Sequence, residues 1–352
     1  MTNRLMTSLV VLVLSTGAAM ADGKINIITS FPDSMTGPIE AAFEAANPQY
    51  DLEVLNKKTS AGVKFIQETS DNNTSDIFWA SAPDAFEVLK NDDLLADVSI
   101  KSEGIPDMIG AYPLNDPDGK YYGFAGAGYG IMWNERYLKA NGLEPAAEWG
   151  DLAKPEYYGH VGMSAPSRSG TTHLTVETLL QGEGWDRGWA KWKRVAGNFS
   201  TVTERSFGVP DGVNTGNFGL GIVIDFFGFS SKASGFPVNF HYPTITSLVP
   251  ANVGVVSNAP NEAGAVAFIE YLLTPEGQEV LLNPAIMRLP INPATYANAP
   301  EGFPNPFEDS TIGATVKFDV AKSGARYNLV NSMFDVMITY RLDDLSETVG
   351  AI

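Results

Sequence analysis

The sequence of 352 residues contains no cysteine. Disulfide bridges, thiolate metal sites and thiol catalysis are therefore excluded. A bacterial lipid anchor is not expected either, because it is attached to a cysteine at the mature N-terminus. Stability must come from a buried apolar core, which a chain of this length can supply.

Positive charge is also scarce. The 23 lysines and arginines stand against 41 aspartates and glutamates, so the formal net charge is −18. Nucleic acids and anionic membranes bind through lysines and arginines that neutralise phosphates, so neither is an expected partner. We interpret the acidic balance as an aid to solubility, and recruitment of a cationic ligand is the alternative.

Long hydrophobic runs are missing apart from a short one, Leu9 to Leu14. It follows Arg4 and precedes Ala19-Met20-Ala21, the small-residue pattern of a signal-peptide cleavage site. The run is about half of the 20 or so apolar residues that a membrane-spanning helix needs. We therefore predict a secretion signal over residues 1–21, cleavage after Ala21, and a freely diffusing protein in the periplasm.

Beyond the signal, short apolar runs alternate with helical patterns. Apolar runs predict three strands, and a helical pattern follows each one. The strands are expected over 24–29, 51–55 and 75–79, and the helices over 39–46, 63–69 and 83–90. The order βαβαβα predicts a parallel sheet with right-handed crossovers.

Small residues, most of them polar, follow each of these predicted strands. In open parallel sheets ligands bind beyond the carboxyl ends of the strands, so these residues are candidates for ligand contact. The simpler interpretation is that they only form turns. The candidates are Ser30, Phe31, Ser60, Ser81 and Ala82.

A glycine-rich apolar stretch, Tyr122 to Trp133, is interpreted as a crossing between two lobes. A second α/β pattern follows it, with strands expected over 160–163 and 219–225 and helices over 172–181 and 185–196. At about 100 to 200 residues per domain, the length also favours two domains.

The chain is expected to return to the first lobe through a second apolar run, Ala251 to Val256. Helices over 263–273 and near the C-terminus, where Val330 and Phe334 share one face, are expected to complete that lobe.

Three segments carry a resemblance to a known family: the strand that ends in Thr29-Ser30-Phe31, the crossing Gly128 to Asn134, and the loop Ser164 to Thr172. The segment Leu272 to Gly277 matches as well. The chain resembles solute-binding proteins of ABC importers with the type II periplasmic-binding-protein fold. Within that fold it is similar to the branch of ferric-iron, sugar-phosphate, phosphoglycerate and aminoethylphosphonate receptors.

This resemblance implies an α/β fold of two lobes, joined by interlobe crossings, with a ligand cleft between them. One lobe is expected to contain residues 22–126 and 251–352, and the other residues 127–250. The resemblance further implies a monomer without enzymatic activity, cofactor or metal, which delivers a small anionic ligand to a membrane permease.

A hydroxyl-rich loop leads into the helix expected over 172–181. Helix N-termini carry free N–H groups and a partial positive charge, which suit an anion. The alternative is that a serine or threonine of the loop only caps the helix. The candidate anion-binding residues are Ser167, Arg168, Ser169, Gly170, Thr171 and Thr172.

The iron receptors of this branch place two adjacent tyrosines where this sequence has Phe226 and Phe227, and a phenyl ring has no oxygen to coordinate iron. Asp225, at the end of the strand, is a candidate for ligand contact or for a helix cap. His241 and Tyr242 are the nearest polar candidates on the next strand.

The favoured ligand is therefore a small phosphorylated or phosphonate organic anion, of the phosphoglycerate, sugar-phosphate or aminoethylphosphonate class. The same fold with ferric iron, a polyamine or a neutral sugar is the first alternative. An exported hydrolase is the second, with a serine beside Asp225, His241 or His173, although the sequence has no G-x-S-x-G elbow.

Overall fold

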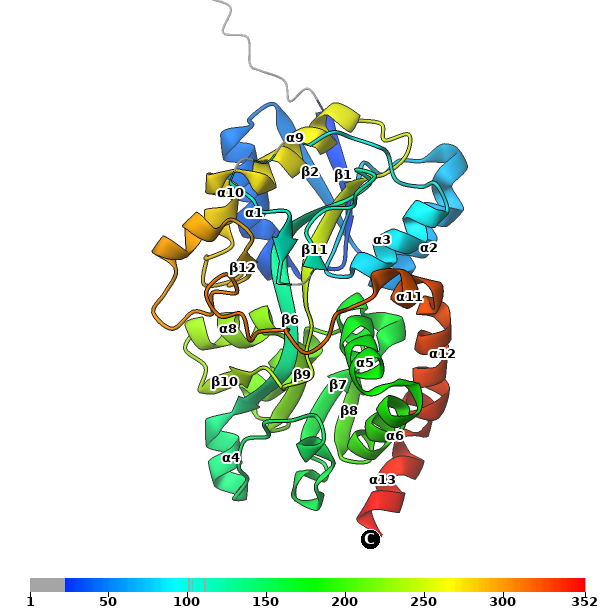
Figure 1. Ribbon diagram of the computed structural model, residues 1–352, viewed down its shortest axis with the longest axis vertical. Coiled ribbons are helices and arrows are strands. Elements are labelled where there is room, and N and C mark those ends of the chain that lie inside the picture. Colours follow the sequence, from blue (N-terminus) through cyan, green and yellow to red (C-terminus); the bar gives the residue numbers. More distant parts are fainter. Residues whose placement is uncertain (1–22, 101, 103, 111, 352) are drawn as a thin grey trace, which may run out of the picture.

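The fold is described from a computed structural model that covers residues 23–351 except 101, 103 and 111. The expected secretion signal, 1–21, lies outside this range. The molecule is elongated, and one long strand, β6, runs along its centre from one end towards the other (Figure 1). Among the described helices, none has the length and apolar character needed to cross a membrane.

The first lobe is built on a parallel sheet, as predicted. Strand β1 lies between β2 and β3 and pairs in parallel with both. Buried Ile25, Ile27 and Ile28 of β1 make it the centre of this sheet. The elements in chain order are β1 Gly23–Thr29, α1 Asp33–Ala46, β2 Tyr50–Asn56, α2 Thr59–Thr69, β3 Ile77–Ala80 and α3 Pro83–Asn91.

Two long strands connect the lobes, and both expected crossings are confirmed. The first is β6 (Tyr122–Asn134), and the second is the antiparallel β11 (Leu248–Val255). The glycines of β6 allow close packing: a Cβ at Gly130 would lie 2.1 Å from the carbonyl oxygen of His241. The crossing strands therefore form a continuous sheet that joins the two lobes.

The second lobe continues this sheet beyond β6 in the order β9, β7, β8. Its core includes Trp192 and Trp189, which lie on the buried face of helix α6 (Trp185–Ala196). The elements are α4 Glu135–Asn141, β7 Val161–Ser164, α5 Gly170–Glu183, α6 Trp185–Ala196, β8 Phe199–Thr203, α7 Gly208–Thr215, β9 Leu220–Ile224, α8 Asp225–Ala233 and β10 Val238–His241.

After β11 the chain returns to the first lobe, as expected. Helix α9 (Glu262–Leu273) buries Phe268 and Ile269 in the first-lobe core, and α10 (Pro275–Val280) follows it. The short strand β12 (Leu289–Pro290) then pairs with β6. A small hairpin of β4 (Met108–Ile109) and β5 (Tyr112–Pro113) also lies on this lobe.

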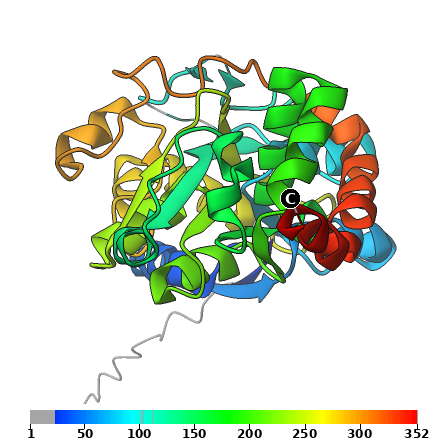
Figure 2. The ribbon, with the colours of Figure 1, turned by 90° about the horizontal axis from the view of Figure 1, so that it is seen from below.

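The expectation that the C-terminal helices complete the first lobe does not hold. Helix α12 (Tyr327–Met337) lies beside α5, and α13 (Leu342–Gly350) lies against α6 (Figures 1 and 2). Val330 and Phe334 are fully buried in the second-lobe core. An apolar helix face indicates that it will be covered but not by which surface. Helix α11 (Val320–Ala325), just before α12, reaches back to α3 of the first lobe.

A buried ion pair fastens α12 to the second lobe. The guanidinium of Arg326, the residue before α12, donates two hydrogen bonds to Glu177 of α5, from Nε at 2.7 Å and from Nη2 at 2.6 Å. The Glu177 side chain has no exposed surface. A fully buried carboxylate is stable as an anion only when it is paired, so this contact should carry much of the docking of the C-terminal helices.

We expect Arg326→Met to lower the free energy of unfolding by about 3 kcal/mol, because it leaves Glu177 buried and unpaired. The matched control is Arg341→Met, which removes an exposed pair with Asp344 and should cost less than about 0.5 kcal/mol. Urea unfolding of both variants at pH 7.5 measures the difference. Equal losses in the two variants would contradict the role given to Arg326.

Candidate functional site

The two lobes touch each other across the cleft. The Ser60 hydroxyl of the first lobe donates to the Ser167 carbonyl of the second at 2.6 Å. The Gly170 N–H donates to the Thr59 hydroxyl at 3.1 Å. Ser60, Ser167 and Gly170, all predicted ligand residues, thus make interlobe contacts here, and the structure represents a closed form.

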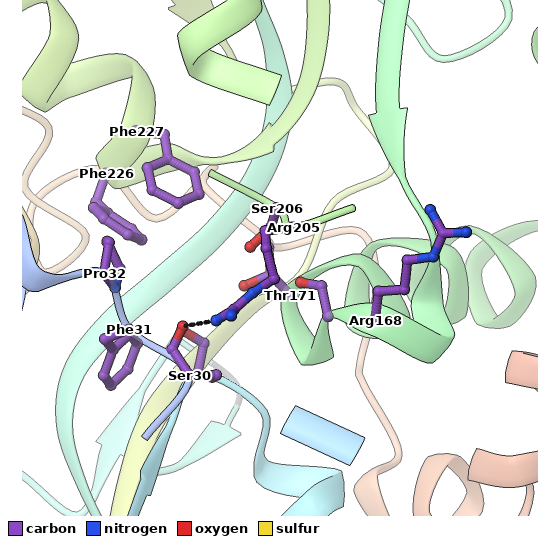
Figure 3. Close-up of a pocket in the computed structure, with 11 residues that line it drawn as sticks. Ser30, Phe31, Pro32, Arg168, Thr171, Arg205, Ser206, Phe226 and Phe227 are labelled. Atoms are coloured by element: carbon purple, nitrogen blue, oxygen red, sulfur yellow. Dashed lines mark hydrogen bonds between the residues drawn. The ribbon is translucent and has the colours of Figure 1, made fainter. Parts of the chain in front are cut away.

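A pocket lies beside these contacts and is lined by both lobes (Figure 3). Six of the predicted ligand residues meet there: Ser30, Phe31, Ser81, Arg168, Ser169 and Thr171. Five further lining residues were not predicted from the sequence: Pro32, Arg205, Ser206, Phe226 and Phe227.

The N-terminus of α5 forms one wall of the pocket. Ser169 has extended backbone angles, and its hydroxyl accepts from the Thr172 N–H at 3.3 Å, so it caps the helix. Because Ser169 also lines the pocket, capping and ligand contact are not exclusive. A Cβ at Gly170 would lie 2.6 Å from the Cβ of Ala82 in the first lobe, so this contact needs glycine. Thr172 and Ala82 are buried and do not line the pocket.

Two arginines stand near this wall and point in different directions. Arg168, predicted as an anion ligand, donates to the carbonyls of Val202 and Thr203 and points away from the pocket centre (Figure 3). Arg205 points inward instead, and its Nη2 lies 2.6 Å from the Asn56 side-chain oxygen and 3.5 Å from the Ser30 carbonyl. In this geometry the inward-facing charge is that of Arg205.

The opposite side of the pocket is aromatic. Phe226 and Phe227 lie in the first turn of α8, and with Phe31 and Pro32 they face the polar wall (Figure 3). At this position iron coordination would need oxygen donors, which phenyl rings lack. Among the described residues, no three histidine, aspartate or glutamate side chains gather in a group suited to a metal ion.

Arg288 lies directly behind the aromatic side and was missed by the sequence analysis. Its side chain is fully buried, and its Nη2 donates to the Ser81 hydroxyl at 2.9 Å. Its guanidinium carbon lies 4.7 Å from the Phe31 ring centroid and 4.5 Å from that of Phe226. Burial lowers the pKa of Arg288 to about 10, so it remains charged at neutral pH. The only available signal was one arginine within the apolar segment 286–291.

Asp225 is held at the crossing and does not line the pocket. Its Oδ2 accepts from the Gly128 N–H at 2.7 Å and from the Tyr242 hydroxyl at 2.8 Å, and its Oδ1 accepts from the Phe226 N–H at 2.8 Å. Burial raises the pKa of Asp225 to about 6, although these hydrogen bonds and the charge of Arg288 oppose the rise. The third polar candidate, His241, is exposed on β10.

The histidines named for the hydrolase alternative are not among the described residues that line the pocket. His173 Nε2 does lie 3.1 Å from an Asp84 carboxylate oxygen and 3.2 Å from the Ser323 hydroxyl. All three side chains have no exposed surface, so a substrate has no access to them. This cluster instead joins α3, α5 and α11, and so links the two lobes.

The raised pKa of Asp225 predicts a specific pH dependence. The folded protein holds the proton more tightly than the unfolded chain, so this contribution to stability is present at low pH and is lost as pH rises through about 6. When the pH is lowered from 7.5 to 5, the unfolding free energy of wild type should therefore rise by about 1 kcal/mol more than that of Asp225→Asn.

Urea unfolding at both pH values measures this difference. Tyr242→Phe removes a hydrogen bond that favours the carboxylate, so it should move the pH midpoint upward. An identical pH dependence in wild type and Asp225→Asn would contradict the assignment.

Comparison with known proteins gives one family match, to the model described as bacterial extracellular solute-binding protein, over residues 72–308. A curated relative, the phosphoglycerate transport regulatory protein PgtC of Salmonella typhimurium, is 30% identical over 329 residues, which is 92% of this chain and 79% of the relative.

Two solved structures share the fold. The periplasmic binding protein AfuA of Actinobacillus pleuropneumoniae, with fructose-6-phosphate bound, has a TM-score of 0.79 at 19% identity, covering 90% of this chain and 98% of AfuA. The apo ferric ion-binding protein A of Pasteurella haemolytica has a TM-score of 0.69 at 16% identity, covering 89% and 97%. The expected two-lobe α/β fold is thereby confirmed, and the chain belongs to the family of bacterial extracellular solute-binding proteins.

Proposed function

We propose that this protein is the periplasmic receptor of an ABC importer and captures a small phosphorylated or phosphonate organic anion by closing its cleft. The observation that carries the proposal is the polar wall of the pocket, where the N-terminus of α5 and the inward-facing Arg205 meet. The secretion signal over 1–21, the permease partner and the monomeric state belong to the same proposal.

The chemistry of this wall supports a phosphoryl or phosphonyl group. The first turn of a 14-residue helix offers a partial positive charge, and Ser169, Thr171 and Ser206 add hydroxyl donors. Arg205 adds a full positive charge, and its guanidinium offers two parallel N–H donors that suit an oxyanion. A group with three oxygens can use several of these donors at once.

The position of the pocket supports capture by closure. Ser30 and Ser81 come from the first lobe, whereas Ser169 and Arg205 come from the second. A ligand that contacts both lobes binds the closed form more tightly than the open one, and that difference drives closure. The relative PgtC is named for phosphoglycerate transport, and the AfuA structure holds fructose-6-phosphate, which agrees with this ligand class.

The alternatives have less support. Iron would need oxygen donors where Phe226 and Phe227 stand, and a polyamine would meet the positive charges of Arg205 and Arg288. The aromatic side would suit a neutral sugar, but a neutral ligand would give the charge of Arg205 no anionic partner in the pocket.

Thermal-shift measurements test the ligand class. The probes are 3-phosphoglycerate, fructose 6-phosphate, 2-aminoethylphosphonate and inorganic phosphate, with putrescine, Fe(III) citrate and glucose as comparison compounds. Binding to the folded state should raise the melting temperature in a saturable way for at least one phosphorylated or phosphonate probe. Stabilisation by a comparison compound alone would contradict the proposal.

Arg205→Gln should weaken binding of the best probe about 10- to 100-fold, as expected for the loss of a charge-assisted hydrogen bond. The matched control is Arg194→Gln, which changes an exposed arginine on α6, away from the pocket. Isothermal titration calorimetry of both variants gives the comparison. Unchanged affinity in Arg205→Gln would remove this residue from the binding wall.

A further inference from the structure

Arg288 carries unused hydrogen-bonding capacity. Its Nη2 donates to Ser81, but within the part of the chain that the structure describes its Nε and Nη1 have no hydrogen-bond partner. The nearby carboxylate of Asp225 is already bonded to Gly128, Phe226 and Tyr242. The guanidinium is therefore buried and charged, and its donors are only partly satisfied.

Such burial is costly for the closed form. Removing a charge from water costs several kcal/mol unless a partner and hydrogen bonds compensate for it. Aromatic rings supply part of the compensation, since Phe31, Phe124 and Phe226 lie 4.7, 5.7 and 4.5 Å from the guanidinium carbon. These rings cannot accept the in-plane N–H bonds of Nε and Nη1.

The residues around Arg288 connect it to the ligand pocket. Phe31, Ser81 and Phe226, which all contact Arg288, also line the pocket. Arg288 precedes β12 in the first lobe, whereas Phe226 lies in the first turn of α8 in the second. The guanidinium is thus enclosed between the lobes, against rings that form the aromatic side of the pocket.

We propose that Arg288 binds a carboxylate of the ligand at the aromatic side of the pocket, while the phosphoryl or phosphonyl group lies at the N-terminus of α5. The ligand is then a short phosphorylated or phosphonylated carboxylic acid with an anionic group at each end. This inference rests on the proposed function and narrows it.

The donors of Arg288 favour a carboxylate over a second phosphoryl group. Aromatic rings flank the guanidinium, and its Nε and Nη1 find no partner among the described residues. A planar carboxylate presents two oxygens to such donors in the fork-to-fork geometry of arginine–carboxylate pairs. The wall at α5, with its several donors, suits the tetrahedral group better.

Two pairs of probes isolate the carboxylate: 3-phosphoglycerate with glycerol 3-phosphate, and 3-phosphonopropionate with propylphosphonate. In at least one pair, calorimetry should show wild type binding the carboxylate-bearing member at least about 30-fold more tightly. Arg288→Met should lose most of this preference and keep its affinity for the other member within about threefold. The four affinities, of two proteins for two ligands, form a thermodynamic cycle that measures the coupling between Arg288 and the carboxylate.

Unfolding distinguishes a ligand-binding role from a structural one. Without ligand, Arg288→Met removes a poorly satisfied buried charge, so its urea midpoint should equal or exceed that of wild type. Arg288→Lys, which keeps the charge but not the fork, should retain only part of the preference for the carboxylate.

Three outcomes would overturn the inference. Wild type could bind both members of each pair equally, in which case the proposed function stands and the inference fails. Arg288→Met could weaken both members equally or show a lower urea midpoint, which would make Arg288 a structural residue. If no phosphorylated or phosphonate probe binds wild type, the proposed function fails as well.

Discussion

The first turn of α5 meets the opposite lobe at a separation that only glycine permits. Gly170 packs against Ala82 and donates its N–H to Thr59, so the two lobes share this contact. The neighbouring Ser169 caps the same helix and lines the pocket. Lobe contact, helix capping and the positive end of the helix therefore coincide, which is the arrangement that the proposed coupling of ligand binding to closure requires.

Buried charged side chains with a structural role differ from the one proposed to bind ligand in how fully they are hydrogen-bonded. Glu177 is fully buried, but Arg326 pairs with both of its oxygens, and this pair secures the C-terminal helices. Asp225 accepts three hydrogen bonds and secures the crossing strands. Arg288 differs because it lies beside the pocket and, among the described residues, its Nε and Nη1 have no hydrogen-bond partner. Hydrogen-bond donors that lack partners at a binding site lower the stability of the empty closed form. They therefore favour closure only around a ligand.

Much of the fold could be predicted from the sequence, because apolar runs and helical periodicity respond to local geometry. The alternation of strands and helices in the first lobe and the glycine-rich crossing are examples. The docking of α12 on the second lobe could not be predicted, since its apolar face fits any apolar surface. At the site, the loop Ser167 to Thr172 was identified through its hydroxyls and its helix. Arg205 and Arg288 were missed because their approach to the pocket depends on tertiary packing, and Arg168 within the loop points away from the pocket centre.

Coupling between anion binding and closure is the central claim, and small-angle X-ray scattering of the wild-type protein tests it directly. The radius of gyration should be larger without ligand and should fall when the tightest-binding phosphorylated or phosphonate probe is added to saturation. An unchanged radius of gyration, with binding of that probe verified in the same sample, would contradict the account.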